Sequence, residues 1–206
     1  DQALVAWWPF DGTLADSTEN QLHAAAALSE VEYEADHSQG TSSLFLRKNQ
    51  YVELPSDLLK GDELTVSLWV NSMSSKSWQR LFDFGHDTDH YLFLTSYNGS
   101  SRIALGIKAG GDEQTLATTT RLPLMRWKHV VVTLKPGDAA IYLDGEQIAH
   151  SDAITINPSD VGAFINYLGK SQFKSDPIFT GYLDDVRIYN RAFSSDDVMQ
   201  LFAETY

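Results

Sequence analysis

The chain contains 206 residues, 43% of them hydrophobic and 12% aromatic, which suits one large domain or two small ones with a sizeable core. Its 15 basic and 28 acidic residues give a formal net charge of -13, which argues against nucleic acid and anionic membranes as partners. The absence of cysteine excludes disulfides, thiolate zinc sites and cysteine catalysis, and no apolar run approaches the ~18 residues of a membrane span.

Alternating apolar residues predict short antiparallel strands along most of the chain. Segments 64–70, 102–107, 129–134 and 140–143 place an apolar residue at every second position. This period is typical of a strand with one face in the core. Turn signals separate these segments and include Asn98-Gly99, Gly110-Gly111, Pro136-Gly137-Asp138 and Asp144-Gly145. We expect roughly twelve to fourteen short strands at this spacing.

Two local features are predicted in more detail. Segment 141–149 reads IYLDGEQIA, which predicts a β-hairpin with Asp144-Gly145 at its tip. Segment 194–204 reads SSDDVMQLFAE and predicts a helix, with Ser194 as the N-cap and Asp197 three residues later. The chain shows no repeat and no linker-like composition. We therefore expect one domain over residues 1–206, all-β, with two packed antiparallel sheets in a sandwich or jelly roll and one short C-terminal helix.

The last predicted strand begins with two adjacent aspartates, Asp184 and Asp185, directly before apolar residues. Neighbouring carboxylates repel each other, and a desolvated carboxylate is costly unless something pairs with it. Either one of the two side chains faces water, or a positive group lies beside them.

Several stretches together resemble the laminin G-like, concanavalin A-like lectin superfamily, in the order expected for that family. They read LVAWWPFDGTLADSTENQ, ELTVSLWV, WQRLFDFG, LPLMRWKHVVVTL, IYLDGEQIA, NYLGKSQF and FTGYLDDVRIYNRAFSSDDV. They span nearly the whole chain, and the subgroup they resemble occurs in bacterial secreted and polysaccharide-degrading systems. The resemblance implies a jelly roll whose first and last strands lie side by side.

The resemblance also implies one structural calcium ion that joins the two chain ends. Asp11 and Asp184 lie in the matching motifs, and Asp16 and Asn20 are further candidate ligands. Calcium takes six to eight oxygen ligands from carboxylates, carbonyls and water, which suits this set. In the alternative interpretation Asp11 and Asp16 are ordinary turn residues and Asp185 faces solvent.

The stretch FGHDTDHY contains His86, Asp87, Asp89 and His90 in a predicted loop. Imidazole and carboxylate ligands suit zinc and other transition metals, but the same composition is typical of a polar hairpin loop. The loop is also a candidate edge of a glycan site. Aromatic residues in loops are further ligand-binding candidates, because sugar sites combine aromatic surface with a few polar groups. They are Trp78, Tyr97, Tyr167 and Phe173.

Glu30, Glu32 and Glu34 alternate along one predicted strand, as the catalytic carboxylates of glycosidases with this fold do. Their flanks, Ser29 and Ala35, depart from that family's motif, so we interpret the three side chains as a solvated face and expect no catalytic residues. No nucleophile elbow, phosphate-binding loop or dinucleotide fingerprint is present.

These features predict a non-catalytic carbohydrate-binding module of an exported bacterial protein, whether secreted, periplasmic or on the cell surface. Its expected partners are a polysaccharide or glycan and other domains of a larger chain. Two alternatives stay open at this point. One is a protein-interaction or spacer module of a surface protein. The other is a glycoside hydrolase or lyase on the same fold.

Overall fold

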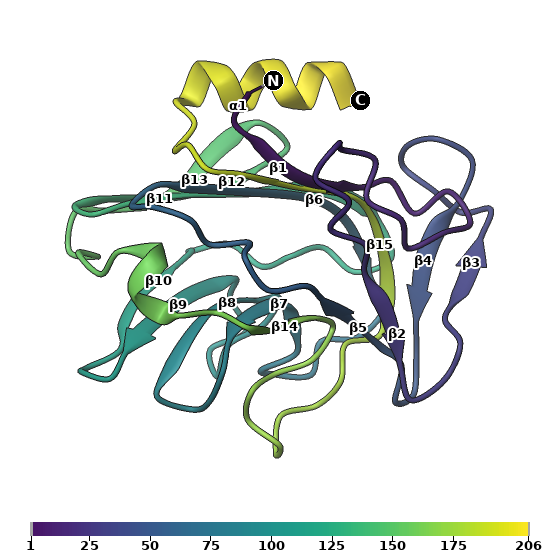
Figure 1. The fold of residues 1–206 in the computed structure, drawn as a ribbon, viewed down its shortest axis with the longest axis horizontal. Coiled ribbons are helices and arrows are strands. Elements are labelled where there is room, and N and C mark those ends of the chain that lie inside the picture. Colours follow the sequence, from purple (N-terminus) through teal and green to yellow (C-terminus); the bar gives the residue numbers. More distant parts are fainter. Residues whose placement is uncertain (1, 206) are drawn as a thin grey trace.

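A computed structural model describes residues 2–205 (Figure 1). Fifteen strands form two sheets that pack face to face, and every pair of neighbouring strands is antiparallel. We call them sheet A and sheet B. The spatial order in sheet A is β13 (Glu146–Ser151), β12 (Asp138–Leu143), β11 (Trp127–Lys135), β6 (Leu64–Ser72), β15 (Gly181–Tyr189), β4 (Ser43–Leu46) and β3 (Glu32–Glu34), with β1 (Leu4–Trp8) paired to β15. The order in sheet B is β10 (Gln114–Ala117), β9 (Ala104–Ala109), β8 (His90–Thr95), β7 (Arg80–Gly85), β14 (Ile165–Leu168), β5 (Tyr51–Leu54) and β2 (Ala25–Ala27).

The predicted fold class is confirmed, including the hairpin at Asp144-Gly145. β12 and β13 pair directly across this turn. Asp144 and Gly145 both adopt positive φ, at 51° and 82°. Two successive residues with positive φ make the tight hairpin turn whose twist matches that of the strands. Outside the strands and the C-terminal helix, residues Pro158–Val161 form one turn of 3-10 helix.

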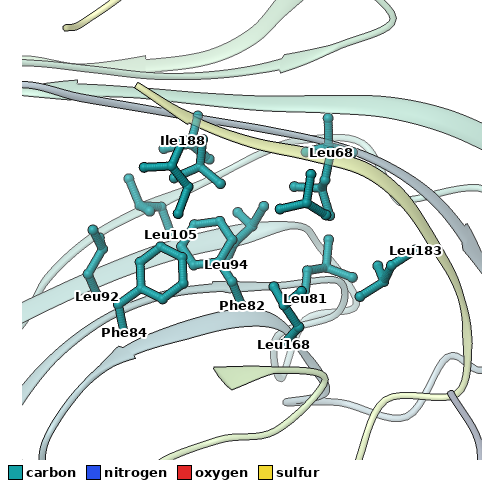
Figure 2. Close-up of a cluster of buried hydrophobic side chains, with 14 of the residues drawn as sticks. Leu68, Leu81, Phe82, Phe84, Leu92, Leu94, Leu105, Leu168, Leu183 and Ile188 are labelled. Atoms are coloured by element: carbon teal, nitrogen blue, oxygen red, sulfur yellow. The ribbon is translucent and has the colours of Figure 1, made fainter. Parts of the chain in front are cut away.

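The core lies between the two sheets and follows from the period-two pattern (Figure 2). Leu68, Leu183 and Ile188 descend from sheet A toward Phe82, Phe84 and other apolar side chains of sheet B. Removal of this apolar surface from water is the main driving force for the fold. The alternate residues of the sheet B strands, such as Phe93, therefore point away from the core and build the outer face of that sheet.

The helix α1 (Ser195–Thr205) covers the outer face of sheet A (Figure 1). It begins with the predicted capping box, because Asp197 N donates to Ser194 Oγ at 3.2 Å and Ser194 N donates back to Asp197 Oδ2 at 2.8 Å. Val198 and Leu201 pack into a second apolar cluster on this face. Within residues 2–205 the structure contains no helix with the length and hydropathy that a membrane crossing requires.

β15 contains a bulge at the two adjacent aspartates. Residues 181–183 pair with β4, whereas residues 186–189 pair with β1, and the register against β6 shifts between Asp184 and Arg187. Asp185 adopts φ 47° at this point. An extra residue in one strand bends that strand and redirects its side chains. The aspartates thus mark the place where β15 changes its partner, and the expected proximity of the first and last strands is confirmed.

Candidate functional site

Three carboxylates meet where the two ends of the chain lie side by side, and we call Asp11, Asp184 and Asp185 the chain-end cluster. Asp184 is fully buried and Asp185 is 2% exposed, so the interpretation of Asp185 as a solvent-facing residue is wrong. Segment 38–42 links the cluster. Its backbone N–H groups donate to Asp184 Oδ2 at 2.9 and 2.8 Å and to Asp11 Oδ1 at 2.5 and 3.1 Å.

Two carboxyl groups of the cluster are only partly compensated by the residues around them. Burial raises the pKa of Asp184 to about 7, although two backbone N–H groups oppose the shift. Burial also raises the pKa of Asp185, against the opposing effect of the Arg187 guanidinium at 3.1 Å. Asp184 Oδ1 and Asp185 Oδ2 are buried and have no hydrogen-bond partner within residues 2–205. Buried polar atoms are normally satisfied, so these two oxygens fit a bound cation.

The other two predicted calcium ligands, Asp16 and Asn20, are engaged in hydrogen bonds of their own. The Asp16 carboxylate accepts hydrogen bonds from Trp7 N, Thr18 N, Thr18 Oγ1 and Leu22 N at 2.7–2.9 Å. Burial opposes ionisation, but these bonds outweigh it and lower the pKa of Asp16. Asn20 Nδ2 donates to the Val5 carbonyl at 2.8 Å. Both side chains therefore fasten the loop after β1 to that strand.

A second candidate site lies on the outer face of sheet B, and we call it the Trp78 pocket. It has a volume of about 210 Å³. Two of the predicted ligand-binding residues line it, Trp78 two residues before β7 and Phe173 in the loop between β14 and β15. The remaining lining residues are Arg80, Phe93, Glu113 and Asp176. The pocket thus combines three aromatic rings with one cation and two carboxylates.

Arg80 organises the polar side of this pocket. It is 2% exposed and contacts Asp83 Oδ2 through Nε at 3.3 Å and Asp176 Oδ2 through Nη2 at 3.0 Å. Its guanidinium carbon also lies 3.9 Å from the centroid of the Phe93 ring. Burial raises the pKa of Asp83 to about 7, and the charge of Arg80 opposes this shift. One guanidinium therefore joins the strand β7 to the loop that carries Asp176.

Two backbone features create the aromatic side of the Trp78 pocket. Phe93 pairs with Gly106 across β8 and β9, and a Cβ atom on Gly106 would lie 2.5 Å from the Phe93 ring. Only glycine leaves room for the ring to lie over this strand. Trp78 adopts φ 70° and remains 40% exposed. A bulky residue with positive φ is a genuine outlier, and such strain concentrates at functional sites.

The remaining predicted ligand-binding residues lie elsewhere. Tyr97 is 3% exposed and donates its hydroxyl to the Leu122 carbonyl, so it belongs to the core and offers no ligand surface. His86, Asp87 and Asp89 lie in the turn between β7 and β8, where Asp89 pairs with Lys108 at 2.7 Å. Tyr167 lies on β14, with Lys170 Nζ 4.4 Å from its ring centroid.

Four residues of the Trp78 pocket were not predicted from the sequence: Arg80, Phe93, Glu113 and Asp176. One signal was present in segment 90–95, which reads HYLFLT and is apolar on both faces. Such a strand needs cover on both sides. Phe173 supplies part of that cover, because its ring meets Tyr91 edge to face at 5.5 Å.

Two of the three glutamates considered for the glycoside hydrolase alternative lie in sheet A, not in sheet B. Glu32 and Glu34 belong to β3 at the edge of sheet A, and Glu32 pairs with Arg47 through both carboxylate oxygens. The Trp78 pocket lies on sheet B and includes none of them.

Comparisons with known proteins agree with this fold. The family model described as the concanavalin A-like lectin/glucanases superfamily matches residues 46–199. Domain 4 of AbnA, a GH43 extracellular arabinanase from Geobacillus stearothermophilus solved in complex with arabinotriose, superposes with a TM-score of 0.84 at 22% identity, covering 96% of this chain and 97% of that chain. The binding domain of botulinum neurotoxin serotype C1 superposes with a TM-score of 0.74 at 13% identity, over 100% of this chain and 52% of the other.

One curated relative is an alpha-L-arabinofuranosidase from Bifidobacterium longum subsp. longum, which is 24% identical over 215 residues. The match covers 93% of this chain but 20% of the relative. The chain therefore spans about a fifth of the length of that relative.

Proposed function

The chain belongs to the concanavalin A-like lectin/glucanases superfamily, and we propose that it is a non-catalytic module that binds a carbohydrate in the Trp78 pocket. The observation that carries this proposal is the exposed Trp78 ring beside charged groups held in place by their neighbours. Binding sites for small ligands combine apolar surface with a few fixed polar groups. The Trp78 ring offers a stacking surface, and the pocket carboxylates are acceptors for sugar hydroxyls.

The polar groups of the pocket are prearranged. Glu113 Oε2 accepts the Tyr91 hydroxyl at 2.5 Å, and Asp176 Oδ2 accepts Ser171 Oγ at 2.9 Å and the Arg80 guanidinium. Each carboxylate thus has one oxygen held by a neighbour, which fixes the position of the other oxygen. Groups fixed before binding lose little conformational entropy when a ligand arrives, which favours affinity.

We propose arabinose-containing glycans as the ligand class. The names of two relatives support this choice, since one domain was solved with arabinotriose and the other protein is called an arabinofuranosidase. The same relatives support a module of an exported bacterial protein, because AbnA is described as extracellular and the chain spans only a fifth of the arabinofuranosidase.

Trp78→Ala is expected to weaken binding of arabinotriose by about 30-fold, because truncation of a central aromatic contact typically costs ~2 kcal/mol or more. Isothermal titration calorimetry with arabinotriose and longer arabinan fragments measures this loss. Phe164→Ala is the matched control, since Phe164 is 60% exposed and lies outside the pocket.

Equal affinity of wild type and Trp78→Ala for the same glycan would contradict the assignment of the pocket. A wild-type chain that binds no member of a broad glycan array would instead favour the protein-interaction or spacer alternative. Release of reducing sugar from arabinan by the purified chain would contradict the non-catalytic role.

We also propose that the chain-end cluster holds a structural calcium ion. The two unpartnered buried oxygens of Asp184 and Asp185 support this, and Asp11 adds a third carboxylate at the opposite chain end. When bound, the ion supplies positive charge that neutralises these carboxylates. Residues 38–42 hold Asp11 and Asp184 in place through their backbone N–H groups.

Calcium at ~100 times its dissociation constant is expected to raise the free energy of unfolding by about 2.7 kcal/mol, because the ion binds only the folded chain. Urea unfolding in calcium and in EDTA measures this difference. Asp184→Asn keeps an oxygen that accepts from Ser38 N and Gln39 N but loses the charge, so this variant is expected to show no gain. Asp16→Asn is expected to keep the full calcium response, since Asp16 lies outside the cluster. Identical curves for the wild-type chain in calcium and EDTA would refute the site.

A further inference from the structure

Three side chains converge in the turn between β7 and β8, and we call His86, Asp87 and His90 the His86 turn. Each supplies one ligand atom, and these three atoms lie within 4.8 Å of one another. His90 Nδ1 is 3.1 Å from Asp87 Oδ1, and His86 Nε2 is 3.7 Å from Asp87 Oδ2. One carboxylate therefore contacts a nitrogen of each imidazole.

We propose that the His86 turn is a binding site for a transition-metal ion of the zinc class. Zinc binds imidazole nitrogen and carboxylate oxygen at about 2.0–2.2 Å, so two ligands of a tetrahedral ion lie ~3.3 Å apart. The separations of 3.1 and 3.7 Å bracket this value. This proposal goes beyond the glycan-binding function and does not rest on it, because none of the three residues lines the Trp78 pocket.

The surrounding backbone orients two of the three ligands. His86 Nδ1 lies 2.9 Å from the Gly162 carbonyl, which only accepts hydrogen bonds. Nδ1 must therefore carry the proton, and Nε2 presents its lone pair toward Asp87. A histidine held in this way by a backbone carbonyl is the usual arrangement at metal sites. Asp87 Oδ1 accepts the backbone N–H groups of Asp89 and His90, both at 2.8 Å, which fixes the carboxylate.

The third ligand, His90, has the freedom that binding requires. The His86 and His90 rings stack with centroids 4.5 Å apart and planes 20° apart, so their lone pairs lie in nearly parallel planes that do not converge on one point. An ion can therefore contact both imidazoles only after the His90 ring tilts out of this stack. The His90 side chain is 33% exposed and its ring can turn into solvent. On binding, the ion takes the place of the hydrogen bond between His90 Nδ1 and Asp87 Oδ1, and the neutral ring keeps its one proton on Nε2.

The donor set selects the class of metal. Two imidazoles and one carboxylate favour zinc, nickel or copper, whereas calcium prefers sites built only from oxygen. Asp89 is held by Lys108 at 2.7 Å and does not join the set. With three protein ligands, a tetrahedral ion would keep one position for water or another small ligand. Asp87 is 51% exposed, so the ion can enter directly from solvent.

The test is titration of the calcium-saturated wild-type chain with zinc chloride by calorimetry. Prior saturation with calcium keeps the chain-end cluster from contributing to the signal. We expect one zinc ion per chain, read from the stoichiometry of the titration. Substitution of cobalt for zinc is expected to give the visible spectrum of a four- or five-coordinate ion.

His90→Gln and Asp87→Asn are each expected to raise the dissociation constant for zinc by about tenfold or more. Asp87 is exposed and His90 is partly buried, and melting curves of the metal-free variants check that they still fold. His150→Gln is the matched control, because His150 pairs with Asp138 at 3.1 Å and, within residues 2–205, belongs to no cluster of three possible metal ligands. This control is expected to bind zinc as the wild-type chain does. Zinc binding that is absent from the wild-type chain, or equally tight in all variants, would overturn the proposal.

Discussion

Replacing Arg80 by alanine is expected to lower the free energy of unfolding by about 3–5 kcal/mol, the usual cost of removing one partner of a buried ion pair. Arg80 and Asp83 are 2% and 0% exposed, so the substitution leaves the Asp83 carboxyl in the interior without its counterion. It also removes the ion pair that holds Asp176 at the Trp78 pocket. We therefore expect glycan binding to weaken in the same variant.

Urea unfolding and calorimetry together separate these two effects. The double variant with Arg80→Met and Asp83→Leu replaces both charges by apolar side chains of similar size. It is expected to recover most of the lost stability, because no unpaired charge remains buried. The glycan affinity of the double variant is expected to stay low, since Asp176 still lacks the Arg80 guanidinium. A stable Arg80→Ala variant with unchanged affinity would show that Arg80 organises neither the fold nor the pocket.

Acidification from pH 7 to pH 5 is expected to cost the wild-type chain about 2 kcal/mol more stability than it costs the His129→Gln variant. His129 lies fully buried on β11, with Ser67 Oγ 2.8 Å from Nε2 and with Nδ1 lacking a hydrogen-bond partner in the described chain. Burial lowers the pKa of His129 from 6.5 to about 4. As the pH falls, His129 therefore becomes protonated in the unfolded chain at a higher pH than in the folded chain. The contribution of neutral His129 to the free energy of unfolding is therefore complete above about pH 6.5. It is lost as the pH falls from 6.5 to 4.

Denaturant unfolding at several pH values measures how the free energy of unfolding changes with pH. The difference between wild type and His129→Gln removes the contribution of the carboxylates, which is common to both. Glutamine keeps a hydrogen-bonding group near Ser67 and does not titrate. His150→Gln is the control, since His150 is an exposed residue paired with Asp138. It is expected to reproduce the wild-type slope. Parallel pH dependences of wild type and His129→Gln would mean that His129 does not stay neutral in the fold.

The sequence predicted those parts of the fold that depend on neighbours along the chain. The period-two pattern identified both the strands and their core-facing residues. Asp144-Gly145 identified the tip of the β12–β13 hairpin, and Ser194 with Asp197 identified the start of α1. Each of these features arises from interactions over a few residues, so a short window of sequence contains the necessary information.

The bulge in β15 was beyond such local patterns. Its sequence, with Asp184 and Asp185 before apolar residues, raised the question of what compensates two carboxylates. The answer depends on β1 and β4, which pair with different halves of the strand, and on the loop that donates to Asp184. Asp16 illustrates the same limit, because its four hydrogen bonds come from Trp7, Thr18 and Leu22, and short sequence patterns do not show which of these groups it meets.

The sequence by itself thus determined an all-β sandwich, its core-facing positions, its C-terminal helix and the family to which the chain belongs. Only the tertiary structure decided which of the many polar and aromatic side chains converge. Trp78 and Phe173 were chosen as loop aromatics, yet the Arg80 and Asp176 that join them lie almost a hundred positions apart. Tyr97, a similar candidate in sequence, lies in the core. Periodicity reports the face of a strand on which a side chain lies, whereas a site requires the spatial register of distant strands and the loop that covers them.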